Sequence, residues 1–120
     1  MTPATQRAIE LLRQLIATPS HTRNEGATAD LLAAFLEREG VAVERIHNNL
    51  IARSEGFDPA RDTLLLNSHH DTVRPAASYT HNPYAPIIDS ERLLGLGSND
   101  AGASLVSLLE VFLALRTKQL

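Results

Sequence analysis

The stretch DTLLLNSHHD (residues 62–71) places two imidazoles and a carboxylate directly after a short apolar run. An apolar run of this length between polar residues predicts a strand over residues 63–66 that is buried on both faces. In open α/β sheets, functional residues lie just beyond the carboxyl ends of such strands. We therefore expect a functional site at the end of this strand, with an ordinary polar loop as the alternative.

The spacing of His69 and Asp71 indicates a specific kind of site. In an extended chain these two side chains leave the same face, and His70 leaves the opposite face. A metal-bound histidine normally donates its second ring N–H to a carboxylate or a carbonyl, which fixes the orientation of the ring. We interpret His69 as a metal ligand and Asp71 as the carboxylate that orients it.

The composition is that of one small domain. The chain has 120 residues, 43% of them hydrophobic, a net charge of −3, a single lysine and no cysteine. Without a basic patch, nucleic acid is not an expected partner. The lack of cysteine excludes disulfides and thiolate metal sites and fits a reducing compartment. We find no signal sequence and no apolar stretch long enough to span a membrane, so we expect a cytoplasmic protein without a membrane partner.

Helices and hairpins are predicted around the central stretch. Thr2-Pro3 predicts a helix start, and Thr18-Pro19 predicts its end. Residues 22–25 have the form of a capping box for a second helix, which Gly40 would end. Hairpins are predicted by two further stretches, residues 41–53 and residues 87–94.

Two later segments lack this regular pattern. Residues 72–86 contain three prolines and no periodicity, which indicates either a functional loop or a proline-stiffened connection. Residues 101–115 predict a helix that is apolar on nearly all sides. Because a domain of 120 residues rarely surrounds such a terminal helix, we expect more chain after Leu120 or a partner that covers the helix.

The stretch GLGSNDAG (residues 95–102) forms a second candidate site. A dinucleotide-binding loop needs glycine at the position of Asp100, and a carboxylate there would repel a phosphate. Asp100 is therefore interpreted as a metal ligand, with a helix cap as the alternative. Zinc and cobalt suit mixed imidazole and carboxylate sites, and one carboxylate can bridge two ions.

Both stretches carry a family resemblance. SHHDTV (residues 68–73) resembles the Gly-His-x-Asp-x-Val motif of the co-catalytic zinc aminoacylases and carboxypeptidases, and GLGSND (residues 95–100) resembles their Gly-Arg-Gly-x-x-Asp motif. That family includes acetylornithine deacetylase, succinyl-diaminopimelate desuccinylase and glutamate carboxypeptidases. The amino-acid sequences of the two motifs are most similar to those of the acetylornithine deacetylase branch, and Leu96 and Ala101 are interpreted as typical of that branch.

The resemblance implies a fold and roles for three residues. The fold would be α/β, with residues 1–120 forming the N-terminal portion of an αβα sandwich catalytic domain whose mixed, largely parallel sheet is flanked by helices. His69 would bind one of two zinc ions, Asp100 would bridge both, and Asp71 would be the catalytic residue that orients His69. The peptide bond after Asp100 would be cis. Cobalt is the alternative metal. The other histidines match no ligand position: His21, His47, His70 and His81.

The family's general base belongs to a Glu-Glu pair that the chain does not contain. Because proton transfer from water needs a positioned base, we expect residues 1–120 alone to be inactive. The expected reaction of the complete enzyme is hydrolysis of the amide bond of a small-molecule N-acyl amino acid, most simply N-acetylornithine in arginine biosynthesis. A homodimer would form only through regions absent here.

Two alternatives remain from the sequence. The first is a non-catalytic module that depends on a partner to cover its last helix. The second is a two-metal phosphoesterase, which is the weaker alternative because Arg74 is the one cation beside either motif.

Overall fold

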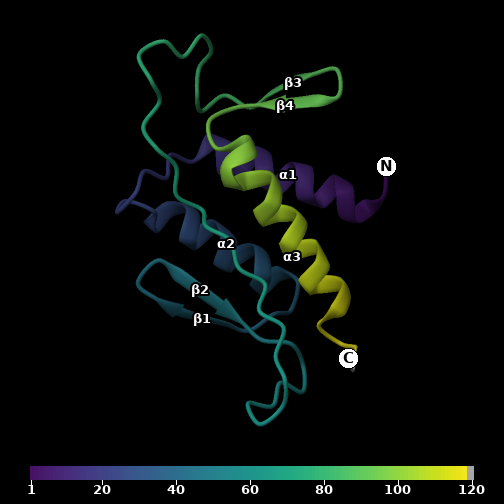
Figure 1. Cartoon of the computed structure of the whole chain (residues 1–120). Helices are drawn as coiled ribbons and strands as arrows, with labels where there is room; N and C mark the ends of the chain where they lie inside the picture. The colour runs from purple at the N-terminus through teal and green to yellow at the C-terminus, as the bar shows by residue number, and fades with distance from the viewer. Residues whose placement is uncertain (119–120) are drawn as a thin grey trace.

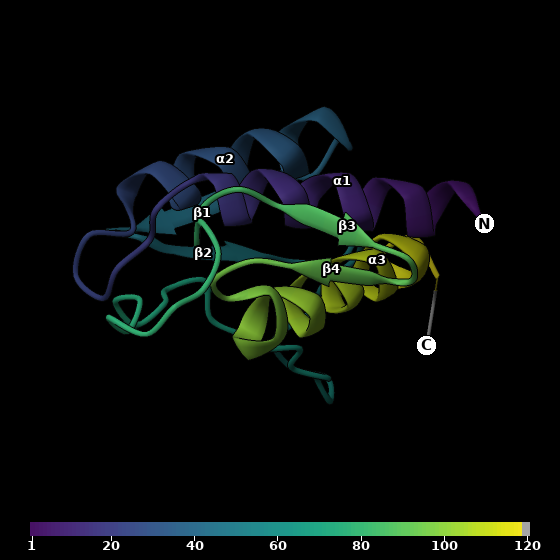
Figure 2. The same cartoon turned by 90° about the horizontal axis from the view of Figure 1, so that it is seen from above.

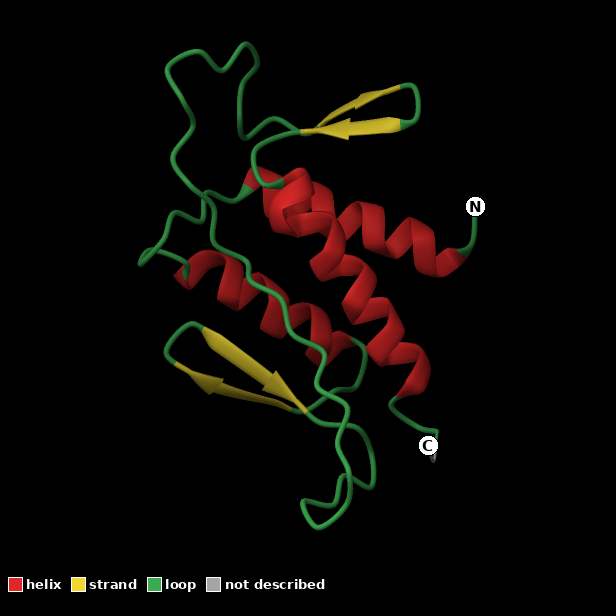
Figure 3. Ribbon diagram, in the orientation of Figure 1, coloured by secondary structure: helices red, strands yellow, loops and turns green. Residues whose placement is uncertain are grey.

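Three helices and two hairpins make up the computed structural model, which describes residues 1–118 (Figures 1 and 3). The elements, in chain order, are α1 (Pro3–Ala17), α2 (Gly26–Arg38), β1 (Val43–Ile46), β2 (Asn49–Ala52), β3 (Ile87–Asp89), β4 (Arg92–Leu94), the irregular helical turn η1 (Ser98–Ala103) and α3 (Ser104–Leu115). The mixture of helices and short strands confirms the α/β class.

Helix α1 has the ends that the sequence predicts. The Thr2 hydroxyl oxygen accepts a hydrogen bond from the Thr5 amide at 3.1 Å, and Pro3 occupies the first turn, where no amide donor is required. The helix ends at Ala17, and Thr18 is extended before Pro19.

Helix α2 begins later than predicted. Its first residue is Gly26, and Glu25, at the N-cap position, makes no side-chain cap hydrogen bond. The capping box predicted over residues 22–25 is therefore wrong, because the Thr22 hydroxyl turns away from the helix and toward the candidate site. The predicted end is confirmed, since Gly40 takes a left-handed φ of 75° just after the helix.

The core lies among the three helices and the β1–β2 hairpin. Figure 2 shows α1 and α2 along one side of the molecule and α3 on the other side. The buried apolar side chains that form one cluster are Leu11, Leu12, Ile16, Leu32, Phe35, Leu36, Val41, Leu105, Val106 and Leu109. Burial of such side chains contributes about 1.5–3 kcal/mol each and is the main force that fixes the helices.

The predicted central strand over residues 63–66 is not a strand in the structure. The segment is extended without regular pairing, and Leu64 and Leu65 are 70% and 79% exposed. A strand buried on both faces needs neighbouring strands and helices over both faces, and residues 1–118 supply neither there. Neither the strand nor the burial that the apolar run predicted is observed.

The predicted largely parallel sheet is likewise not observed in the described part of the chain. Both hairpins are antiparallel, with Val43 opposite Ala52 in the first and Ile87 opposite Leu94 in the second. The two hairpin predictions are confirmed. Parallel pairing is limited, over residues 1–118, to a single bridge between His21 and Thr72.

Helix α3 is buried on one face instead of nearly all round. Leu105, Val106 and Leu109 lie in the core, whereas Val111 is 47% exposed. The 18-residue span Ser98–Leu115 has a mean hydropathy of 1.2, so by length and composition it is long enough to cross a membrane, contrary to the sequence-based expectation. The span includes the non-helical turn at Asp100 and Ala101, and α3 contacts α1.

Candidate metal centre

The His69 ring lies between two carboxylates. Its Nδ1 atom is 3.1 Å from Asp71 Oδ1, and its Nε2 atom is 3.1 Å from Asp100 Oδ1. Asp71 and Asp100 come from the two motifs that the sequence singled out, 29 positions apart, and the fold brings both to one imidazole. The three predicted site residues are therefore one cluster.

The irregular turn η1 presents Asp100 to this cluster. Gly97 enters the turn with a left-handed φ of 75°, and the Gly102 amide donates back to the Gly97 carbonyl at 2.9 Å. The peptide bond between Asp100 and Ala101 is cis, as the family resemblance implied. The Asp100 side chain makes no helix-cap hydrogen bond and is 89% exposed, so the cap alternative finds no support.

Asp71 is held at both of its oxygen atoms. Oδ1 faces His69, and Oδ2 accepts a hydrogen bond of 2.6 Å from the Thr22 hydroxyl. The hydrogen bond from Thr22 is the main reason why the pKa of Asp71 lies below its usual value; partial burial opposes the shift, and the charge of His69 adds to it.

The pKa of His69 is shifted upward. Burial alone would lower the pKa of His69. Hydrogen bonds from the ring to the Asp71 carbonyl and the Asp100 carboxylate, together with the charges of both carboxylates, outweigh burial and raise the pKa. The position between two anionic groups therefore stabilises positive charge. A divalent cation in contact with Nε2 and Asp100 would satisfy the same two carboxylates.

The segment from Ser20 to Thr22 runs beside the site and holds the backbone at Thr72, the residue after Asp71. The Thr72 amide donates to the Ser20 carbonyl at 2.6 Å, and the Thr22 amide donates to the Thr72 carbonyl at 3.3 Å. These bonds form the parallel bridge already described. They hold the residue after Asp71 in place although the preceding apolar run is unpaired.

His70 points away from the site, as the alternation of an extended chain predicts. Its Nδ1 atom lies 2.8 Å from the Thr28 hydroxyl of α2, and its Nε2 atom lies 2.9 Å from the Asn48 carbonyl in the first hairpin turn. The Thr28 hydroxyl also contacts Ser20 Oγ at 2.7 Å. His70 thus ties the chain beside His69 and Asp71 to α2 and to the first hairpin.

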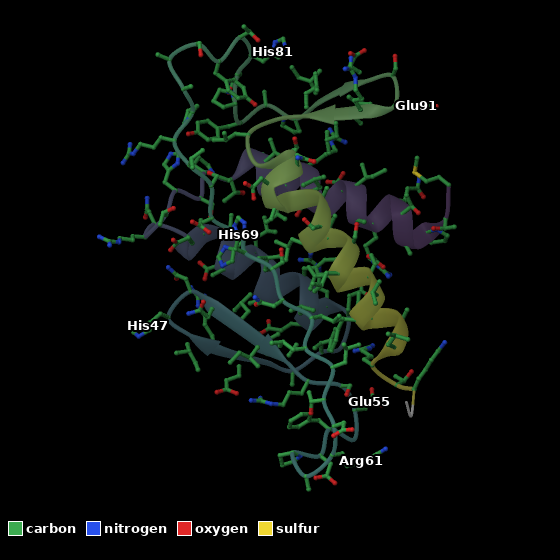
Figure 4. All side chains as sticks on the ribbon, in the orientation of Figure 1. His47, Glu55, Arg61, His69, His81 and Glu91 are labelled. Carbon is green, nitrogen blue, oxygen red and sulfur yellow. The ribbon has the colours of Figure 1, made fainter. Side chains whose placement is uncertain are left out.

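The remaining histidines lie apart from the cluster. Figure 4 shows His69 near the middle of the molecule, His81 at the tip of the proline-rich loop (residues 72–86) and His47 at the turn of the first hairpin. The Nε2 atom of His21 lies 3.0 Å from the Tyr84 hydroxyl, which ties the loop to the segment beside the site. That these histidines are not metal ligands stays a prediction.

An open cavity of about 360 Å³ adjoins the cluster. Its walls come from the chain between His69 and Val73, from the proline-rich loop at Tyr79 and from the glycine-rich stretch of residues 95–100. The lining residues are His69, Asp71, Thr72, Val73, Tyr79, Gly95, Leu96, Gly97, Ser98, Asn99 and Asp100. Because the cavity opens directly onto His69 and Asp100, a small molecule could reach a metal held there.

The donor set fits part of a metal site. One imidazole nitrogen and one carboxylate are available, and Asp71 orients the imidazole as zinc sites require. Catalytic zinc sites take three protein ligands, and within residues 1–118 no three His, Asp or Glu side chains are arranged so that they could hold a metal ion together. His69 and Asp100 could therefore hold a zinc or cobalt ion only together with further ligands.

Sequence reasoning missed Thr22, which was interpreted as a helix cap. Thr22 lies 49 positions before Asp71, so no local pattern could reveal the contact. The helix-capping preference of threonine arises from the same hydroxyl chemistry, and this is why the pattern was misleading.

No protein-family model matches the chain, but individual relatives do. The chain is 33% identical over 121 residues to the succinyl-diaminopimelate desuccinylase of Delftia acidovorans, covering 90% of the chain and 31% of that protein. It is 37% identical over 101 residues to the protein of the same name from Sphingopyxis alaskensis, covering 77% and 26%. It is 32% identical over 120 residues to a probable carboxypeptidase of Emericella nidulans, covering 91% and 26%.

These relatives define a class, the hydrolases. Their names support the family of aminoacylases and carboxypeptidases that the two motifs indicated. The acetylornithine deacetylase branch, which the motif wording favoured, is not supported by them. The chain spans about a third or less of the length of the curated relatives that it matches.

Proposed function

We propose that residues 1–120 form the N-terminal portion of a metal-dependent hydrolase that cleaves the amide bond of an N-acyl amino acid. The observation that carries the proposal is the His69 ring held between Asp71 and Asp100 in the motif order of the family. Relatives named desuccinylase and carboxypeptidase support the reaction class, since both names describe amide hydrolysis.

In this proposal the residues of the chain bind and orient. His69 would bind one zinc ion through Nε2, Asp100 would bridge two ions, and Asp71 would keep the Nδ1 proton of His69 in place. Zinc, when bound, supplies Lewis-acid polarisation of the acyl carbonyl and lowers the pKa of water. The general base and the remaining ligands would come from other parts of the full-length protein. Cobalt is the second candidate metal.

The proposed substrate is an N-acyl amino acid with one of two acyl groups. The relatives' names favour an N-succinyl group, as on diaminopimelate, and thereby a place in lysine biosynthesis. The sequence HHDTV (residues 69–73) favours N-acetylornithine, and thereby arginine biosynthesis. A cytoplasmic location, a homodimer formed outside residues 1–120 and the lack of a nucleic-acid or membrane partner belong to the same proposal.

The test measures hydrolysis by the full-length protein after chelation and after addition of zinc. The panel holds N-succinyl-diaminopimelate, N-acetylornithine, a peptide with a C-terminal glutamate, and a phosphate ester. We expect zinc-dependent release of one acyl group, loss of at least a thousandfold in kcat for Asp100→Ala, and near-normal activity for the remote variant His81→Ala. Full activity in Asp100→Ala would refute the metal role, and hydrolysis of the phosphate ester alone would favour the phosphoesterase.

The second candidate is a non-catalytic module. It is favoured by the two-ligand donor set of residues 1–118 and by the exposed flank of α3 around Val111. This candidate predicts that the full-length protein binds no zinc and hydrolyses no member of the panel. Zinc binding with a dissociation constant below a micromolar would exclude it.

A further inference from the structure

We propose that Thr22 is a positioning residue of the metal centre, which holds Asp71 in the orientation in which Asp71 fixes the His69 ring. The inference rests on the proposed function, because it gives Thr22 a role in the same site. Thr22 lies in the segment before α2, far from either motif, and its hydroxyl makes the shortest side-chain contact to Asp71.

The geometry of Asp71 is the first step of the argument. A carboxylate that accepts one hydrogen bond can still rotate about its terminal torsion, which is broad for aspartate. Here Oδ1 lies 3.1 Å from His69 Nδ1, and Oδ2 lies 2.6 Å from Thr22 Oγ1. Contacts at both oxygens fix the plane of the carboxylate. The fixed plane then determines the direction in which Oδ1 meets the imidazole.

The second step concerns the support of Thr22 itself. Its amide donates to the Thr72 carbonyl, and the Thr72 amide donates to Ser20, so the backbones on either side of the contact are joined. Ser20 is buried and contacts Thr28 of α2 through its hydroxyl. Although the Thr22 side chain is exposed, its Cα position is therefore set by a hydrogen-bonded ladder.

The third step excludes the other role of Thr22. A threonine just before a helix usually caps it, but α2 begins four positions later, at Gly26, and Thr22 makes no hydrogen bond to its first turn. The described hydrogen bonds of Thr22 go to Asp71 and Thr72. The hydroxyl therefore serves the site and not the helix.

The test compares three variants of the full-length protein: Thr22→Val, Thr22→Ser and, as a control, Thr63→Val in the exposed extended segment. Two quantities are measured. The first is the affinity for zinc, by calorimetry with Zn²⁺ alone. The second is the tautomer of His69 in the metal-free protein at pH 9, by long-range ¹H–¹⁵N correlation spectra of ¹⁵N-histidine-labelled protein. Circular dichroism establishes that each variant is folded.

We expect Thr22→Val to bind zinc about tenfold more weakly, at the lower end of the range for outer partners of metal ligands. We also expect the Nδ1-protonated fraction of its His69 to be smaller than in the unchanged protein, because Asp71 would hold that proton less firmly. Thr22→Ser keeps the hydroxyl and should stay within about twofold, as should Thr63→Val.

An unchanged tautomer in a folded Thr22→Val variant would overturn the inference, whatever the zinc affinity. The two proposals fail in different ways. If no variant and not even the unchanged protein bound zinc, while Thr22→Val still altered the tautomer, the positioning role would stand and the metal-dependent function would fall. Equal losses in Thr22→Val and Thr63→Val would also overturn the inference, since the effect would then not depend on the contact with Asp71.

Discussion

Among the ion pairs, we expect the pair between Arg7 of α1 and Glu110 of α3 to lower the free energy of unfolding most when one of its charges is removed. Arg7 Nε and Nη2 donate to the two Glu110 carboxylate oxygens at 2.9 and 2.6 Å, and Glu110 is 13% exposed on a helix with no other charged residue. Arg7 also lies 3.4 Å from Glu39 at the end of α2. One guanidinium thus joins all three helices.

The substitution Arg7→Met removes the charge but keeps most of the apolar stem. Breaking a fully buried pair costs about 3–5 kcal/mol, and an exposed pair costs about 0.2–1 kcal/mol. Because Arg7 is 37% exposed and Glu110 is 13% exposed, the pair lies between these limits. We expect a loss of about 2 kcal/mol in the free energy of unfolding.

The assay is urea unfolding followed by circular dichroism. With a slope of about 1–3 kcal/mol per molar urea, a loss of about 2 kcal/mol lowers the midpoint by about 1 M. The control Arg92→Met breaks the exposed pair of Arg92 and Asp89, at 73% and 51% exposure, and should change stability by less than about 0.5 kcal/mol. The double variant Arg7→Met/Glu110→Leu removes the unpaired carboxylate and should recover most of the loss.

Equal midpoints for Arg7→Met and Arg92→Met would refute this reasoning. So would a double variant less stable than Arg7→Met, because the cost would then not come from an unpaired carboxylate on α3.

Three further outcomes are expected. Gly102→Ala should destabilise the protein by about 1–3 kcal/mol, since its Cβ would lie 2.6 Å from the Gly97 carbonyl oxygen, whereas Gly26→Ala, with its nearest atom at 3.9 Å, should be tolerated; equal unfolding midpoints would contradict this. The pKa of Asp71 is lowered on folding, so its contribution to stability is present above its unfolded pKa and is lost as pH falls through the folded pKa. Thr22→Val should raise the folded pKa of Asp71 toward its ordinary value, as measured by carboxyl ¹³C shifts. An unchanged pKa would show that the Thr22 hydrogen bond does not cause the shift. Chelation should lower the Tm of the full-length protein and zinc should restore it, because a ligand that binds only the folded state stabilises it; a constant Tm would count against a bound metal.

Sequence patterns predicted the local elements well, because their causes are local. The Thr2 cap, the stop before Pro19, the turn at Gly40 and both hairpins depend on residues within a few positions of one another. The site cluster was also predicted, since its two motifs carry the residue types that metal chemistry needs. The structure brings His69, Asp71 and Asp100 into contact, and their metal-binding and orienting roles stay a prediction.

What the sequence could not supply were contacts between distant segments. The hydroxyl of Thr22 had an equally good local partner in a helix start, and only the tertiary fold decides between that partner and Asp71. The leucines of residues 63–66 predicted burial because apolar runs are usually packed against other elements. Whether such packing occurs depends on neighbouring strands and helices, which the sequence of the run does not reveal.

The unpaired extended segment before His69 has a practical consequence for handling the isolated chain. Leu64 and Leu65 are exposed there, and no backbone hydrogen bond is formed over residues 63–66 in the described structure. Such an apolar edge is a template for pairing between chains, and the run itself carries no charge or proline to prevent it. The isolated 120-residue chain should therefore aggregate with increasing concentration, and a lysine in place of Leu65 should act as a gatekeeper that keeps it dispersed.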